Sequence, residues 1–168
     1  MEKVRDIKVN SEMKIKDLLD ELKNIGGFQA QEVYRGYEIL KEMFEDKNVI
    51  KVLSFPADII ATGIRGVIKD IIKKKLFDIV ITTCGTLDHD IARLEGDYYI
   101  GYFETDDVYL REMGIMRLGN IFIPIDNYGP AIENFLRERL KKIHEDVKKE
   151  GKSDISTFEF IWKLGETL

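Results

Sequence analysis

The sequence has 168 residues, of which 26 are basic and 31 acidic, so its formal net charge is −5. This length suits one compact domain, and the acidic balance argues against a general nucleic-acid binder. The longest apolar runs span a few residues, far below the ~18 needed to cross a bilayer, and residues 1–3 do not begin a signal peptide. We therefore expect a soluble, cytoplasmic protein with neither nucleic acid nor a membrane as its partner.

Residues 1–48 are predicted to form a helical segment. Apolar side chains recur every three or four residues from a possible N-cap at Ser11 to the pair Gly26-Gly27, which indicates one amphipathic helix. A second helical pattern begins at Phe28 and ends at Glu45, and residues 46–48 have the composition of a turn. The pattern typical of a strand first appears at residue 49.

The next segments predict a β-α-β unit. Residues 49–54 are rich in β-branched side chains and are bounded by turn residues, as expected of a buried strand. Helical spacing follows over residues 60–72, and residues 78–83 indicate a second buried strand. Because one crossover helix joins them, the two strands should be parallel with a right-handed connection.

Shorter elements fill the rest of the chain. They are a helix at 86–94, a strand at 98–101, a helical turn at 106–113, a strand at 120–124, and helices at 130–150 and 155–167. The apolar stripe over residues 158–164 is predicted to serve packing rather than ligand contact. The alternation predicts an α/β fold, a parallel sheet flanked by helices, in a single domain overall.

Two loops could carry a binding site. In an open parallel sheet, ligands bind beyond the carboxyl ends of the strands. Loops 55–63 and 82–90 each leave a predicted strand and open a helix, so their backbone N–H groups could receive a phosphate. Neither loop contains G-x-G-x-x-G or a P-loop. Spacing alone leaves two interpretations open, a nucleotide site and ordinary strand-to-helix turns.

The second loop also carries side chains that could react. Asp88, His89 and Asp90 could suggest a metal, but adjacent residues on a helix diverge and the sequence has no further His or Cys cluster to complete a coordination shell. Cys84 is the only cysteine, so it forms no internal disulfide. It could act as a nucleophile with His89 as its base, whereas a small buried thiol is the simpler interpretation.

Four ordered motifs make the sequence recognisable. They are Gly27-Phe28-Gln29-Ala30, Ala61-Thr62-Gly63-Ile64-Arg65, the run from Ile81 to Asp90, and the run from Met113 to Pro124. With these motifs the chain resembles the amino-terminal half of deoxyhypusine synthase in its archaeal form. The resemblance implies that residues 49–168 are the amino-terminal part of an NAD-binding, Rossmann-like domain and an incomplete half of a larger fold.

The activity that this resemblance implies is NAD-dependent transfer of an aminobutyl group. In that family NAD takes a hydride from spermidine, an enzyme lysine captures the resulting imine, and the butylamine group passes to one lysine of the precursor of translation initiation factor five-A. The resemblance also implies site residues. The first NAD segment matches Ala57, Asp58, Ile59, Ile60 and Ala61, the second matches Thr83, Cys84 and Gly85, and the paired glutamates on the polyamine and nicotinamide ribose side fall on Asp88 and His89.

Several of these positions depart from the family pattern. Ala57 and Ala61 lack the hydroxyls that the pattern offers to NAD. Asp58 would place a negative charge near the pyrophosphate, which is unfavourable unless it faces a ribose or a basic group. His89 replaces an anion that would pair with a protonated amine, so Asp88 is expected to carry that role. These departures also allow a noncatalytic subunit that activates a paralogue, and a related transferase with a small-amine acceptor is a further alternative.

The resemblance covers one half of the family's sequence. In that family the carboxyl half holds the residues around spermidine and the imine-forming lysine, so we assign no catalytic residue here. We expect the chain to work with a complementary carboxyl-half chain in a tetramer-like assembly that includes self-association, and we expect no transfer from this chain alone.

Overall fold

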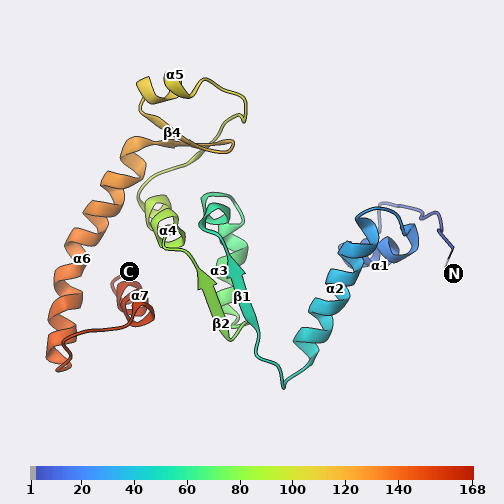
Figure 1. The fold of residues 1–168 in the computed structure, drawn as a ribbon, viewed down its shortest axis with the longest axis horizontal. Coiled ribbons are helices and arrows are strands. Elements are labelled where there is room, and N and C mark those ends of the chain that lie inside the picture. Colours follow the sequence, from blue (N-terminus) through green and yellow to red (C-terminus); the bar gives the residue numbers. More distant parts are fainter. Residues whose placement is uncertain (1–2) are drawn as a thin grey trace. The chain divides into compact units, whose positions relative to one another are not determined.

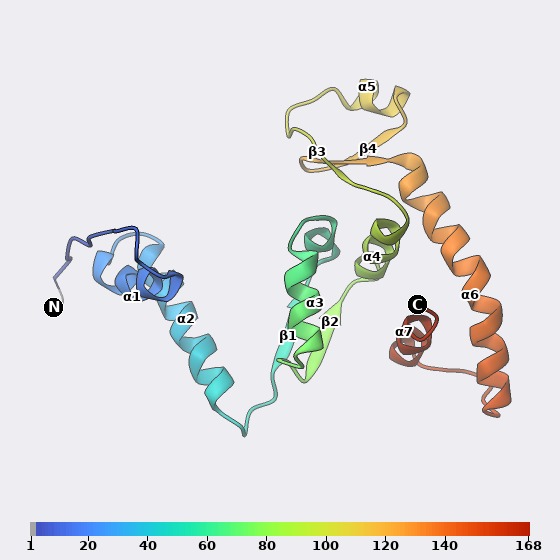
Figure 2. The same ribbon diagram turned by 180° about the vertical axis from the view of Figure 1, so that it is seen from behind.

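The computed structural model describes residues 3–168, which form two compact units (Figure 1, Figure 2). One unit ends at Val52 and also takes in Lys75–Ile79. The other comprises Leu53–Lys74 and Val80–Leu168, and it holds both of the loops singled out above. Within residues 3–168, every helix is too short or too polar to cross a bilayer.

The first unit contains two helices that pack together, α1 (Ile15–Ile25) and α2 (Ala30–Glu45). The apolar spacing predicted both of them. Helix α1 starts later than Ser11, because its N-cap is Lys14, whose backbone N–H donates to the Asp17 carboxylate at 3.0 Å. The helix ends at Gly26, whose φ of 65° is the left-handed conformation that glycine adopts without strain.

The predicted β-α-β unit is confirmed. It consists of strand β1 (Val52–Phe55), a 3-10 turn η1 (Ala57–Ala61), helix α3 (Arg65–Lys73) and strand β2 (Ile79–Thr82). The two strands are parallel, because the start of β1 is bonded to the start of β2 and the end of β1 is bonded to the end of β2. The Ile79 N–H donates to the Lys51 carbonyl at 3.1 Å where they start, and the Thr82 hydroxyl donates to the Phe55 carbonyl at 2.8 Å where they end.

The crossover helix begins later than the spacing over 60–72 predicted. Residues 57–61 form the separate turn η1, and α3 starts only at Arg65. The Thr62 hydroxyl donates to the Ile59 carbonyl at 2.7 Å and accepts the Ile64 N–H at 3.2 Å. Such local bonds compete with the helical ladder, which explains the break. The apolar spacing continues across it because Ile60 and Ile68 are both buried against Phe55.

The strands after β2 form a second sheet that is antiparallel, which corrects the prediction of one parallel, Rossmann-like sheet along the chain. The elements here are α4 (Gly85–Glu95), β3 (Tyr99–Ile100), α5 (Asp107–Glu112), β4 (Ile115–Leu118) and β5 (Ile121–Pro124). Their strand order is β3-β5-β4, with both pairs antiparallel. Strand β4 was not predicted. A two-residue turn, Gly119-Asn120, joins it to β5, and so short a connection permits only antiparallel pairing.

Three elements complete the second unit, the turn η2 (Ile125–Asn127) and the helices α6 (Gly129–Lys149) and α7 (Thr157–Gly165). The main core lies where α4, α6 and α7 meet, with Ile91, Phe135, Ile143, Val147 and Leu164 buried. The predicted packing role of the 158–164 stripe is confirmed for Leu164 and for half-buried Phe160. Phe158 and Trp162 of the same stripe contact each other edge-on, yet their side chains are exposed.

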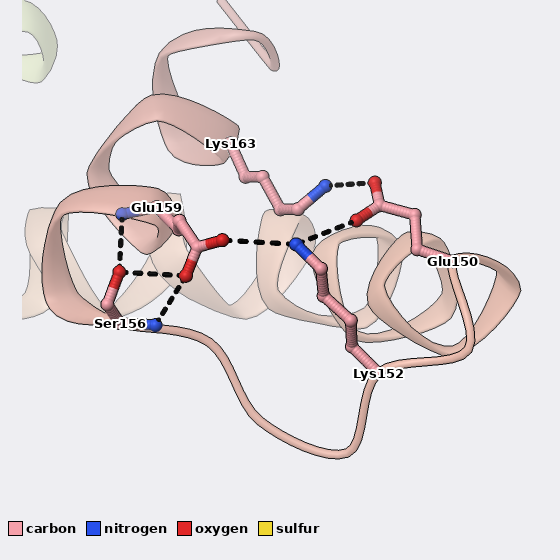
Figure 3. A network of polar contacts seen from close by, with 5 residues as sticks. All are labelled: Glu150, Lys152, Ser156, Glu159 and Lys163. Carbon is pink, nitrogen blue, oxygen red and sulfur yellow. Dashed lines mark hydrogen bonds and ion pairs between the residues drawn. The ribbon is translucent and has the colours of Figure 1, made fainter.

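A polar network links α7 to the end of α6 (Figure 3). The Glu159 carboxylate accepts the backbone N–H and the hydroxyl of Ser156, both at 2.8 Å, and forms the capping box that starts α7. Lys152 lies 3.0 Å from Glu159 and 3.6 Å from Glu150, which also receives Lys163 at 2.5 Å. The hydrogen bonds from Ser156, with the contact to Lys152, lower the pKa of Glu159 to about 2. The carboxylate therefore stays ionised in mildly acidic solution.

Candidate functional site

The two loops predicted to bind a ligand lie in contact at the carboxyl ends of β1 and β2. A Cβ built on Gly85 would lie only 2.8 Å from the Cβ of Ala57, so the first residue of α4 and the first residue of η1 touch. The Thr82 hydroxyl bonded to the Phe55 carbonyl holds the two strand ends together just before this contact. Parallel pairing brings the two loops to one edge, as the sequence predicted.

The five predicted site residues of the first loop differ in how exposed their side chains are. Asp58 is exposed, and Ala57 and Ile59 are half-buried. Ile60 and Ala61 are 3% and 2% exposed, and the Ile60 side chain packs in the core with Phe55. Ile60 and Ala61 could therefore meet a ligand only through their backbone.

The second loop presents the start of helix α4. Thr83 and Cys84 are exposed, which is contrary to the interpretation of Cys84 as a buried thiol. Gly85 is the first residue of an eleven-residue helix, whose amino-terminal N–H groups attract negative charge. The hydroxyls of Thr82 and Thr86 lie 2.6 Å apart and fix the turn that leads into the helix. The loop therefore offers the exposed Thr83 hydroxyl and the positive end of the helix dipole, which suit a phosphate, while the Thr86 and Leu87 N–H groups donate to the Thr83 and Cys84 carbonyls at 3.0 and 2.9 Å.

His89 is buried, unlike the exposed residues of the two loops. Its side chain is 8% exposed and its ring packs against Tyr98 and Tyr128, with ring centroids 5.8 and 5.3 Å away. Its Nδ1 lies 3.0 Å from the Tyr98 hydroxyl. Burial raises the pKa of Tyr98 to about 12, so that hydroxyl keeps its proton and can donate. Burial also lowers the pKa of His89, although the nearby Asp88 and Asp58 oppose this, and the ring is neutral at neutral pH.

Asp88 is the acidic residue of the first turn of α4. It is half-buried, and its charge contributes to a raised pKa at Tyr128, for which burial is the larger cause. A carboxylate in this partly desolvated position can bind an ammonium group more strongly than one in free solution.

Two arginines tie α4 to the segment that contains η1 and α3. Arg65 Nε lies 2.5 Å from the Asp90 carboxylate. Arg93 donates from one nitrogen to the Ile60 carbonyl at 2.9 Å and to the Thr62 carbonyl at 2.5 Å. Sequence reasoning assigned no role to Arg93, Tyr98 or Tyr128. Arg93 contacts carbonyls more than 30 residues earlier, and Tyr128 contacts the His89 ring from beyond the second sheet, so no local motif indicated either of them.

Neither a metal site nor the hollow described next involves these two loops. The part of the chain that the structure describes contains no group of three or more His, Cys, Asp or Glu side chains arranged to hold a metal. A hollow of about 380 Å³ in the second unit is lined by residues of α5, β4 and Ile125, none of them from the two loops.

Comparison with known proteins bears on this arrangement. The profile of the family described as "Deoxyhypusine synthase" matches residues 17–168. A "Probable deoxyhypusine synthase" from Picrophilus torridus is 49% identical over 167 residues, which are 99% of this chain and 52% of that protein. The protein of the same description from Thermoplasma acidophilum is 46% identical over 152 residues, covering 90% of this chain and 49% of that protein. A third protein of this description, from Ignicoccus hospitalis, is 42% identical over 168 residues, which cover 99% of this chain and 50% of that protein.

The chain spans about half the length of the curated relatives it matches. Those three relatives are archaeal, in agreement with the archaeal form of the motifs. The matched region contains both loops, the β-α-β unit that places them, and the antiparallel sheet. With a family profile that covers nearly the whole chain, the sequence motifs and the comparisons lead to one assignment: the chain belongs to the deoxyhypusine synthase family.

Proposed function

We propose that this chain supplies the dinucleotide side of an NAD-dependent deoxyhypusine synthase. The enzyme would transfer the butylamine group of spermidine to a lysine of the precursor of translation initiation factor five-A. The observation that carries the proposal is the contact between Ala57 and Gly85, which joins the two family-type NAD segments at one sheet edge. A dinucleotide needs adjacent loops at the carboxyl ends of parallel strands, and this arrangement offers them.

The residues at this edge fit NAD. The amino terminus of α4 and the exposed Thr83 suit the pyrophosphate. Asp58 is exposed on the other loop, where a carboxylate can accept hydrogen bonds from ribose hydroxyls. Since Ala57 and Ala61 offer no hydroxyl, the first loop would contact the cofactor through its backbone and through Asp58. When bound, NAD supplies the hydride acceptor for oxidation of the polyamine.

Asp88 is the residue to which we assign recognition of the polyamine. Its carboxylate can pair with a protonated amine, whereas the buried, neutral ring of His89 cannot supply such a charge. The contact between His89 and Tyr98 instead supports a role in fixing the orientation of α4. In this proposal Asp88, and not His89, supplies the negative charge that this chain offers to the polyamine.

We also propose that the other half of the family's sequence completes the fold and the site. Parallel sheets normally have both faces covered, yet β2 is exposed along its length, with Val80 and Ile81 at 40% and 55%. Further strands beside β1 and β2 would make the Rossmann-like sheet, and a complementary carboxyl-half chain would supply the imine-forming lysine. Self-association into a tetramer-like assembly belongs to the same proposal.

The test is a reconstitution with labelled spermidine, NAD and the precursor of translation initiation factor five-A. We expect transfer of label only when this chain is combined with the other half of the family's sequence. Omission of NAD and replacement of the precursor by free putrescine are the controls, and the second detects a small-amine acceptor. Efficient transfer by this chain alone, or transfer that does not need NAD, would contradict the proposal.

A noncatalytic subunit is the second candidate, and a specific observation favours it. The two alanines of the first loop lack the family's hydroxyls, and Ala61 is also buried. The number of NAD molecules bound per assembly separates the two functions. If this chain binds NAD, substitution of Thr83 and Gly85 lowers that number; if it only activates a paralogue, the number stays unchanged.

A further inference from the structure

Arg93 closes the end of the first loop onto helix α4. It lies near the carboxyl end of that helix, and one guanidinium nitrogen donates to the carbonyls of Ile60 and Thr62 at 2.9 and 2.5 Å. Those carbonyls stand at the last turn of η1, where a short helix leaves acceptors open; the Thr62 carbonyl also accepts the Arg65 backbone N–H at 3.3 Å. A half-buried cation therefore satisfies the loop's backbone from outside.

Arg93 and the neighbouring Arg65 make different connections. The Arg65 side chain joins α3 to α4 through Asp90 and makes no bond to the Ile60 or Thr62 carbonyl; only the Arg65 backbone N–H, which a substitution keeps, donates to the Thr62 carbonyl. Arg93 bonds directly to the backbone of the loop, and its guanidinium also lies 5.8 Å from the centroid of the Tyr98 ring. The loop is thus linked through Arg93 to the same helix that carries Asp88.

We propose that Arg93 is a positioning residue, which holds the NAD loop that contains Asp58 against the helix that carries Asp88. This inference rests on the proposed function. Arg93 touches neither ligand in this assignment, and it acts by holding the η1 backbone in its binding conformation. A guanidinium suits the task because its several donors are held in a rigid plane, so one group can serve two carbonyls, whereas the single ammonium of lysine is less constrained.

The experiment compares Arg93→Met, Arg93→Lys and the control Arg65→Met in the reconstituted assembly. Loss of both charge-assisted bonds should raise the KM for NAD roughly tenfold in Arg93→Met. The KM for spermidine should stay within about twofold of the wild-type value, because the variant keeps Asp88. Loss of one contact to the polyamine would instead raise this KM about tenfold. Arg93→Lys should recover part of the NAD affinity, and Arg65→Met should leave the KM for NAD unchanged.

Hydrogen exchange of the unligated protein gives a second readout that does not depend on catalysis. In Arg93→Met, amides of residues 57–64 should exchange faster, while those of α6 keep their wild-type rates. Equal increases in both KM values, a fall in kcat alone, or unchanged exchange over 57–64 would overturn the role of Arg93. If the wild-type assembly bound no NAD, the proposed function would fail, and with it the functional part of this inference. The exchange experiment would still decide whether Arg93 holds the loop.

Discussion

Replacement of Gly85 by alanine is a direct test of the contact between the two loops. The added Cβ would lie 2.8 Å from the Cβ of Ala57, whereas carbon atoms in contact normally lie about 3.5–4.0 Å apart. Ala57 has no rotatable side chain that could give way, so the backbone of one loop must shift. Overpacking of this kind costs about 1–3 kcal/mol, and the better helix propensity of alanine returns roughly 0.5–1 kcal/mol.

The middle of these ranges gives a net loss of about 1 kcal/mol, which lowers the Tm by roughly 2–4 °C for a chain of this size. Thermal melting by circular dichroism measures it. Ala57→Gly removes the opposing methyl group. In that background Gly85→Ala should therefore cost much less stability than it costs in the wild-type chain. Gly66→Ala is the matched control, because its new Cβ meets no atom within 4 Å and should be neutral or stabilising. A neutral Gly85→Ala, or no recovery with Ala57→Gly, would refute the contact.

Three further changes have defined outcomes. Ser156→Ala removes the N-cap of α7 and should cost about 1 kcal/mol in unfolding experiments, whereas Ser156→Thr, which keeps a hydroxyl for Glu159, should cost less. Because burial lowers the pKa of His89 from 6.5, the unfolded chain binds more protons near that pH, so stability should fall as the pH drops below 6.5. His89→Gln should flatten this part of the pH profile, and an unchanged slope would contradict it. Asp88→Asn should weaken binding of spermidine more than binding of NAD in calorimetric titrations, and equal losses would argue against its assigned role.

The β-α-β unit could be predicted because its signals are local. Strands at 49–54 and 78–83 were expected, and the structure has them at Val52–Phe55 and Ile79–Thr82. The interruption by Thr62 could not be read from apolar spacing, since the buried stripe continues through the break. Strand direction predicted that the loops of Ala57 and Gly85 lie at one sheet edge, and the structure adds their direct contact.

The antiparallel sheet was missed although the sequence carries a signal for it. Gly119-Asn120 between two apolar runs is a typical hairpin turn, and Gly119 has a φ of 60°. Arg117 in the preceding run interrupts its apolar pattern, and its side chain pairs with Asp107 at 2.6 Å. The burial of His89 could not be predicted, because Tyr98 and Tyr128 reach it from other segments.

The exposure of Cys84 has a practical consequence. It is the only cysteine among the 168 residues, and it directly precedes Gly85 at the start of α4. A thiol-reactive fluorophore would therefore label the wild-type chain at one known position, with no prior removal of other thiols. The dye would sit beside the loop contact, where its emission could report ligand occupancy in real time.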